Sequence, residues 1–145
     1  MYHHFLADLA FDLDGQASLL KLPESFDAIL EALESRSPPA RLAAALCMRN
    51  LAFSADGQAA ILNKPRALPA LIRAVHPNDL RLASRAAAAL WALIGQCERG
   101  KAALRAAPRL NELKVAERAL TSYTARPMAF QRCCSWPFEH TALGL

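Results

Sequence analysis

Side chains that could carry out catalysis or hold a metal are scattered along this 145-residue sequence. The four histidines do not have the HExxH spacing, and the four cysteines do not form a CxxC pair. Ser54, Ser84 and Ser135 lack the GxSxG setting of an esterase nucleophile, and the neighbouring Cys133 and Cys134 favour a thiol pair over a metal site. We therefore expect no enzymatic activity, no cofactor and no metal site.

Five other side chains have the chemistry to bind a partner. Arg81 and Arg85 are one helical turn apart, so both could contact an acidic segment of a partner. The alternative is that they lie on a solvated helix face. Trp91 offers a large rigid contact surface, or it packs between helices. Asn50, next to Arg49, could hydrogen-bond a peptide backbone or bridge neighbouring helices. The expected ligand is a protein or peptide, with an acidic segment as one alternative, and no small-molecule substrate.

The positive charge is concentrated in the second half of the chain. The net charge is +4, with −2 over residues 1–72 and +6 over residues 73–145. A basic half can attract an acidic partner or, weakly, nucleic acid, and it can also be a solvated helical surface. A loose basic strip lacks the interleaved aromatic residues of a single-strand nucleic-acid platform; it consists of Arg99, Lys101, Arg105 and Arg109. Nucleic acid is therefore not the expected partner.

Composition indicates helices as the elements that carry these residues. Alanine occurs 31 times and leucine 24 times, and both rank highest in helix propensity, whereas β-branched apolar runs are missing. No stretch is apolar enough for a membrane span. The N-terminus does not resemble a signal peptide, and the cysteine usage favours a reduced, intracellular protein. The expected fold class is all-α, in a cytoplasmic protein.

The sequence repeats itself at a spacing of 42 residues. Asp14-Gly15-Gln16 aligns with Asp56-Gly57-Gln58, Pro23 aligns with Pro65, and apolar positions agree across a second, weaker step. Three copies in one register predict a solenoid of three-helix repeats, with an ordinary helical bundle as the alternative. Asp56 is expected to cap a short helix, and Pro65 to open the next. Residues 1–11 are predicted to be the end of a long helix. The other predicted helices are 15–21, 23–35, 39–53, 57–63, 65–75, 80–96, 98–106 and 109–122.

Domain boundaries follow from this register. Residues 1–122 are expected to form one repeat domain, with a partial repeat over 1–38 and full repeats over 39–79 and 80–122. Residues 123–145 break the periodicity and are predicted to be an irregular or disordered tail. The alternative is a segment that folds back and covers the last repeat with Trp136 and Phe138.

Two blocks of sequence resemble the long third helix of armadillo repeats. They are Ala45-Leu46-Cys47-Met48-Arg49-Asn50-Leu51 and Ala87-Ala88-Ala89-Leu90-Trp91-Ala92-Leu93-Ile94. The second block is followed by Lys101-Ala102-Ala103-Leu104, and together they are similar to the C-terminal armadillo repeats of the rotatin family over about residues 40–120.

The resemblance implies a short armadillo-type α-solenoid, a right-handed superhelix whose third helices line a peptide-binding groove. It also implies a non-catalytic scaffold in centriole or basal-body assembly or cilia, located in the cytoplasm at the centrosome or basal body. The second hypothesis is a generic armadillo adaptor in transport or ubiquitin pathways. The third is an enzyme or a nucleic-acid binder. The register places Asp8 and Ala92 opposite Asn50, so the asparagine ladder of importin-type members is missing. Groove candidates are Arg49, Asn50, Arg81, Arg85 and Trp91.

Overall fold

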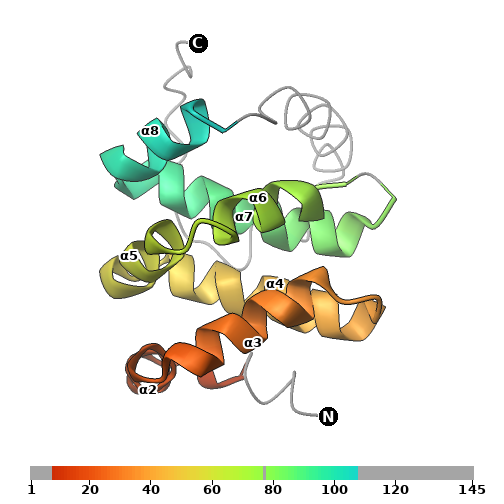
Figure 1. The fold of residues 1–145 in the computed structure, drawn as a ribbon, viewed down its shortest axis with the longest axis horizontal. Helices are drawn as coiled ribbons and strands as arrows, with labels where there is room; N and C mark the ends of the chain where they lie inside the picture. The colour runs from red at the N-terminus through yellow and green to blue at the C-terminus, as the bar shows by residue number, and fades with distance from the viewer. Residues whose placement is uncertain (1–7, 77, 108–145) are drawn as a thin grey trace, which may run out of the picture.

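The chain folds as a stack of α-helices joined by short turns (Figure 1). The computed structural model describes residues 8–76 and 78–107, and no strand occurs in these two ranges. The all-α class predicted from composition is confirmed. The helices are α2 (Leu13–Lys21), α3 (Pro23–Glu34), α4 (Pro38–Ala52), α5 (Ala55–Asn63), α6 (Ala67–Ala74), α7 (Leu80–Gln96) and α8 (Glu98–Arg105).

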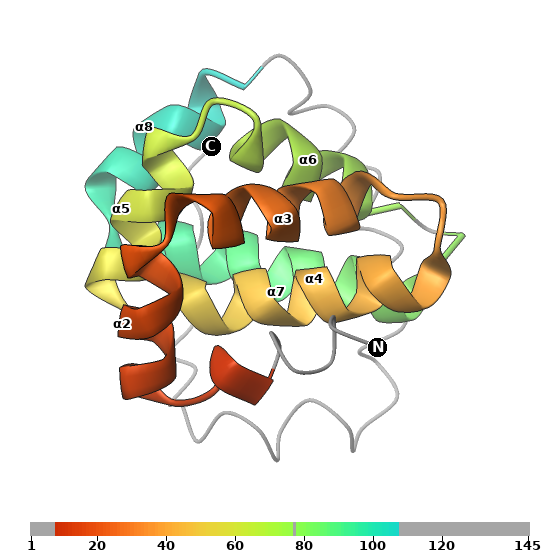
Figure 2. The same cartoon turned by 60° about the horizontal axis from the view of Figure 1, so that its bottom comes forward.

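Two successive three-helix units, α2–α4 and α5–α7, lie one on top of the other. Their first helices begin at Leu13 and Ala55, and their third helices at Pro38 and Leu80, in both cases 42 residues apart. Each helix packs against its counterpart, with the most extensive contact between α4 and α7. Figure 2 shows these two third helices side by side. Helix α8 follows α7 and packs on α5, in the way that α5 packs on α2.

Local sequence signals explain where the helices begin. Pro23 and Pro38 occupy first-turn positions, where a missing N–H costs no intrahelical hydrogen bond. The Asp79 side chain accepts a hydrogen bond from the Leu82 N–H at 3.1 Å, so it caps α7. The predicted bounds of 80–96 for this helix are confirmed.

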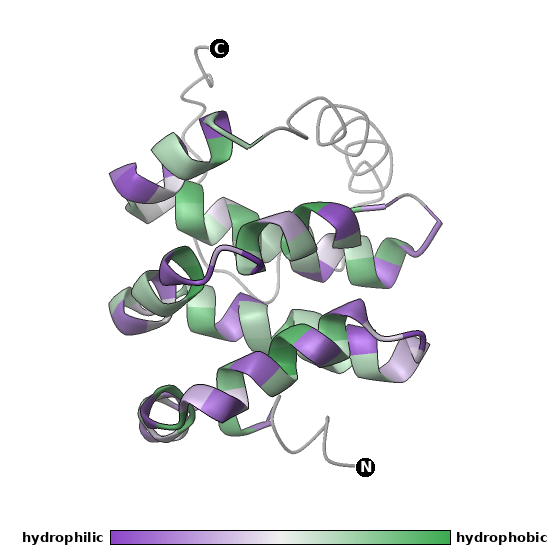
Figure 3. Ribbon diagram, in the orientation of Figure 1, coloured by the Kyte–Doolittle hydropathy of each residue, from purple (hydrophilic) through white to green (hydrophobic). Residues whose placement is uncertain are grey.

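Small and branched apolar side chains form the core between the units. Along α4, one apolar stripe is completely or almost completely buried; it consists of Ala44, Met48, Leu51 and Ala52. Alanines also line the contact between α4 and α7, including Ala45, which is completely buried. Figure 3 shows apolar segments alternating with hydrophilic ones along the helices. This amphipathic pattern is what lets stacked helices bury one side of each element.

Three predicted helix starts are wrong by two residues. Helix α2, predicted from residue 15, begins at Leu13 because the helical backbone extends to the residue after Asp12. Helix α5 is capped by Ser54, whose hydroxyl accepts from the Gly57 N–H at 3.2 Å, so Asp56 lies inside the first turn and is not the cap. Helix α6 begins at Ala67 and not at Pro65. The residues before α6 form a turn, in which the Ala67 N–H donates a hydrogen bond to the Lys64 carbonyl at 3.0 Å.

The recurring Gly-Gln pair joins the first helix of a unit to the end of the preceding third helix. Gln58 donates to the Ala52 carbonyl, and Gln16 to the Ala10 carbonyl, both at 2.9 Å. A Cβ at Gly57 would collide with the Leu51 carbonyl oxygen, and one at Gly15 would collide with that of Leu9. The repeated motif is therefore a packing device, because only glycine allows this approach.

Ion pairs join the second helices α3 and α6 and the turn before α6. Glu34 accepts from Arg66 at 2.6 Å and also pairs with Arg73, while Lys64 pairs with Asp27 at 2.7 Å. These five residues form the α3–α6 ion-pair network. The pKa of the Glu34 carboxyl is lowered below its ordinary value of 4.5. The hydrogen bond from Arg66 is the largest cause, and the positive charges of Arg66 and Arg73 add to it.

Several predictions lie outside the described residues. They are the helix over 109–122, the irregular tail over 123–145, the thiols of Cys133 and Cys134, and most of the helix end over 1–11. Within residues 8–76 and 78–107, no helix is both long and apolar enough to cross a membrane.

Candidate functional site

One face of the stacked third helices gathers most of the candidate binding residues. Leu42, Leu46, Arg49 and Phe53 follow one another along α4 at the spacing of a single helix face. Ser84, Ala88, Trp91 and Gly95 occupy the same face of α7, 42 residues later, with Arg81 and Arg85 beside them. We call these ten residues the α4–α7 face. All ten are exposed or half-buried.

Arg85 reaches across from α7 to α4. Its Nη1 donates to the Leu42 carbonyl at 2.9 Å, and the side chain is half-buried. A charged donor on a carbonyl contributes more than a neutral one, roughly 1.5–3 kcal/mol. This contact fixes the guanidinium on the α4–α7 face and leaves its Nε–H and Nη2–H without a hydrogen-bond acceptor among residues 8–76 and 78–107.

Arg49 and Asn50 form a local pair on α4. The Nε and Nη2 groups of Arg49 donate to Asn50 Oδ1 at 3.3 and 3.1 Å. Asn50 is only 8% exposed, and its backbone carbonyl accepts from Gln16 at 3.4 Å. The Asn50 side chain thus bonds its neighbour on α4, and the contact with α2 is made by its backbone carbonyl, so these contacts do not decide between the two roles predicted for the side chain. The amide positions the Arg49 guanidinium.

Apart from Gly95, the exposed members of the face are aromatic or basic. Trp91 is 53% exposed and Phe53 is 44% exposed, and Arg81 is also exposed. Trp91 and Arg49 occupy equivalent positions in the 42-residue register. Phe53 was not among the sequence candidates, although its spacing of four residues from Arg49 would have placed it on this face.

Positive charge accumulates on the α4–α7 face, and no carboxylate of the described residues forms an ion pair with it. Burial, together with the charges of Arg49 and Arg81, lowers the pKa of Arg85. Among the described residues, the ion pairs involve only other cations, namely Lys64, Arg66, Arg73 and Lys101. An arginine cluster of this kind attracts anionic groups.

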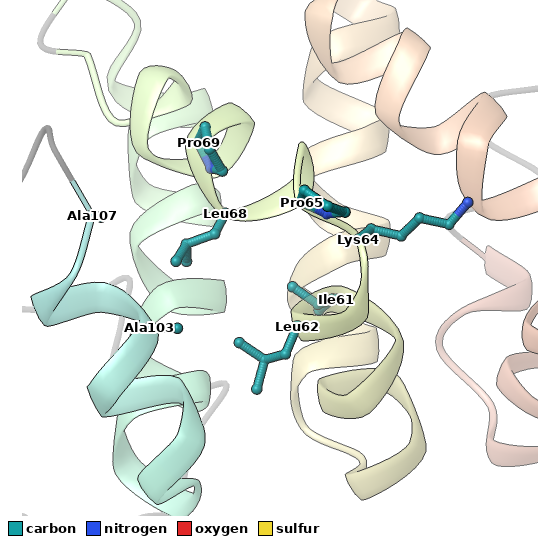
Figure 4. A pocket seen from close by; sticks show the side chains of 8 residues that line it. All are labelled: Ile61, Leu62, Lys64, Pro65, Leu68, Pro69, Ala103 and Ala107. Atoms are coloured by element: carbon teal, nitrogen blue, oxygen red, sulfur yellow. The ribbon is translucent and has the colours of Figure 1, made fainter.

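A hollow lies on another part of the molecule, between α5, α6 and α8. It is an apolar hollow of about 230 Å³, lined mainly by Ile61, Leu62, Leu68, Ala103 and Ala107. Figure 4 shows Leu62 and Leu68 directed toward Ala103, whereas the Lys64 chain extends away.

The repeat explains why this hollow exists. At the corresponding place between α2, α3 and α5, Phe26 and Ile61 are both almost completely buried and fill the space. One repeat later the equivalent residues are Leu68 and Ala103, which are smaller. The hollow is therefore a packing deficit at the second junction, and it brings no polar or titratable groups together for chemistry.

Potential metal-binding and nucleophilic groups do not converge in the described part of the chain. No group of three or more His, Cys, Asp or Glu side chains in residues 8–76 and 78–107 could hold a metal ion. Cys47 is buried in α4, and this burial raises the pKa of its thiol to about 12. A thiol of that pKa is protonated at neutral pH and is a poor nucleophile.

The fold and the face define an all-helical protein with a basic, aromatic surface on its stacked third helices. Comparison with protein-family models, with curated proteins and with solved structures finds no match for this chain. Function therefore has to be argued from the α4–α7 face and from the resemblance carried by the sequence.

Proposed function

We propose that this chain is a non-catalytic, armadillo-type interaction module that binds a protein or peptide through the α4–α7 face. The observation that carries the proposal is the chemistry of that face. Arg49, Arg81 and Arg85 have no carboxylate partner among the described residues, and the aromatic rings of Trp91 and Phe53 are exposed beside them. Aromatic residues and arginine are the types enriched where proteins bind one another.

The arrangement of helices supports an armadillo-type unit. Three helices per 42 residues recur, and the third helices stack side by side. In armadillo proteins, this third helix lines the binding groove, and the same helix carries the α4–α7 face here. The engagement of Asn50 by Arg49 argues against peptide clamping by an asparagine ladder.

We further propose that the module acts as a rotatin-like scaffold at centrioles or basal bodies. This step rests on the resemblance of residues 45–51, 87–94 and 101–104 to rotatin-family repeats. The alternative is a generic armadillo adaptor in transport or ubiquitin pathways, which would use the same face for another partner.

Proximity labelling with the full chain in cells tests both steps. The face variant is Phe53→Ala/Arg81→Gln, because both side chains are exposed and have no side-chain hydrogen bond or ion pair with the described residues to lose. The matched control is Leu22→Ala/Arg36→Gln, which removes an exposed apolar side chain and an exposed arginine elsewhere.

Centriolar or basal-body neighbours that are enriched with wild type and control, and lost with the face variant, are the expected result. Enrichment of import or ubiquitin components would support the alternative adaptor and contradict the scaffold role. Neighbours that are unchanged by the face variant would exclude the α4–α7 face as the binding surface.

A further inference from the structure

The three arginines of the α4–α7 face come from two helices and meet on one surface. Arg81 and Arg85 are one turn apart on α7, and Arg85 crosses to the Leu42 carbonyl of α4 at 2.9 Å. Arg49 lies on the same face of α4 as Leu42, two turns further along. Both Arg49 and Arg81 are near enough to act electrostatically on Arg85.

Two of the guanidinium groups are already oriented by the protein. Arg49 uses Nε and Nη2 on Asn50 Oδ1, and Arg85 uses Nη1 on Leu42. An arginine has five N–H donors, so each keeps several for a ligand. Because these side chains are held before binding, a ligand loses less affinity to ordering them.

The number of charges favours a dianion over a carboxylate. A carboxylate supplies one negative charge and two oxygens. Most of the electrostatic repulsion between three neighbouring arginines would then remain uncompensated. A phosphorylated side chain carries about −1.5 to −2 charges at pH 7 and three acceptor oxygens. Arginine binds such oxygens in pairs through its planar fork.

We propose that Arg49, Arg81 and Arg85 bind a phosphorylated side chain of the partner protein. The inference rests on the proposed function, because it names the chemistry of the partner at the same face. Trp91 and Phe53 lie beside the triad and contact apolar residues that flank the phosphate. A protein segment suits this surface better than a membrane, because Arg85 is half-buried against α4 and cannot reach outward to a lipid plane.

Phenyl phosphate is the probe, with benzoate as the carboxylate control. The ¹⁵N-labelled full chain is titrated with each at pH 7 and constant ionic strength, while the arginine Nε–H resonances are followed by NMR. Phenyl phosphate is expected to shift Arg49, Arg81 and Arg85 saturably, and benzoate to bind several-fold more weakly. Affinity should fall as the pH drops below about 6, where the phosphate gains a proton.

Variants separate a specific site from general charge. Arg81→Gln, which removes an exposed side chain, and Arg85→Gln should each weaken phenyl phosphate binding about tenfold. The control Arg36→Gln should leave it unchanged. Equal binding of benzoate, or equal weakening by Arg36→Gln, would overturn the proposal, as would tighter binding to phosphoinositide vesicles through the same arginines.

The proposed function can fail separately from this inference. If the labelled partner binds through the α4–α7 face equally well before and after phosphatase treatment, the phosphate site is wrong while the interaction module stands. If the face variant leaves all partners bound, the proposed function fails, whatever the phenyl phosphate result.

Discussion

The first and second helices of each unit use their polar side chains very differently from the third helices. In α2, α3, α5 and α6, glutamines and charged groups are engaged between helices, as in the α3–α6 ion-pair network. On the α4–α7 face, two arginines hydrogen-bond neutral oxygens, and no carboxylate pairs with them among the described residues. The polar side chains of the first and second helices therefore join helices to one another. Those of the α4–α7 face, together with its aromatic rings, remain accessible to a partner.

The largest expected effect on the free energy of unfolding comes from replacing one glycine by alanine in each region, Gly57 next to the α4–α5 junction and Gly95 on the α4–α7 face. At Gly57, the new Cβ of alanine would collide with the Leu51 carbonyl, so Gly57→Ala should lower the free energy of unfolding by about 2–3 kcal/mol. At Gly95, on the α4–α7 face, no atom of the described residues beyond its chain neighbours and the adjacent helix backbone lies within 4 Å of the new Cβ. Gly95→Ala should therefore raise stability by roughly 0.5–1 kcal/mol.

Urea denaturation of the two variants measures this contrast. Similar destabilisation by both would show that the face is packed as tightly as the junction between α4 and α5, and the comparison would break down.

A smaller effect is expected from filling the hollow at the second junction. Ala103→Ile restores the residue type of Ile61 and should stabilise the fold by about 1 kcal/mol, because it buries methyl and methylene groups beside Leu68. Ala102→Ile is the control at the neighbouring exposed position, with the same change in helix propensity. Because isoleucine has a lower helix propensity than alanine, Ala102→Ile should slightly lower the melting temperature, and a rise of equal size in both variants would contradict filling of the hollow.

The smallest effect concerns the α3–α6 ion-pair network. The pKa of Glu34 is lowered in the folded state, so its contribution is present above its ordinary value of 4.5 and is lost as the pH falls through the folded value. Glu34→Gln should cost up to about 1 kcal/mol at pH 7, because the pairs are partly exposed.

Unfolding measurements between pH 3 and pH 7 check the sign of this effect. The difference between wild type and Glu34→Gln should shrink toward acid pH. A difference that grows as the pH falls would contradict the assignment of a favourable charged pair.

Much of the helical framework could be predicted from the sequence, because its signals are local. Asp79 and the apolar periodicity after it define α7 from residue 80 to residue 96. The cap of α5 was missed because serine and aspartate both suit that position, and only the backbone geometry selects Ser54.

The candidate site was harder to predict, because its contacts join residues far apart in the chain. The reach of Arg85 to Leu42 spans 43 positions and depends on how α4 and α7 stack. The hydrogen bonds from Arg49 to Asn50 Oδ1 depend on the side-chain conformation of Arg49, which the sequence does not specify. The collision that reserves Gly57 for glycine likewise requires the position of the Leu51 carbonyl.

The most direct test of the account pairs unfolding with binding in one variant. For Phe53→Ala/Arg81→Gln, we predict a free energy of unfolding within about 0.5 kcal/mol of wild type, as for exposed positions in general. The affinity for the partner found by proximity labelling should fall at least about tenfold, since exposed aromatic and arginine anchors dominate such interfaces. Unchanged affinity, or a large loss of stability, would contradict the claim that the α4–α7 face is a binding surface.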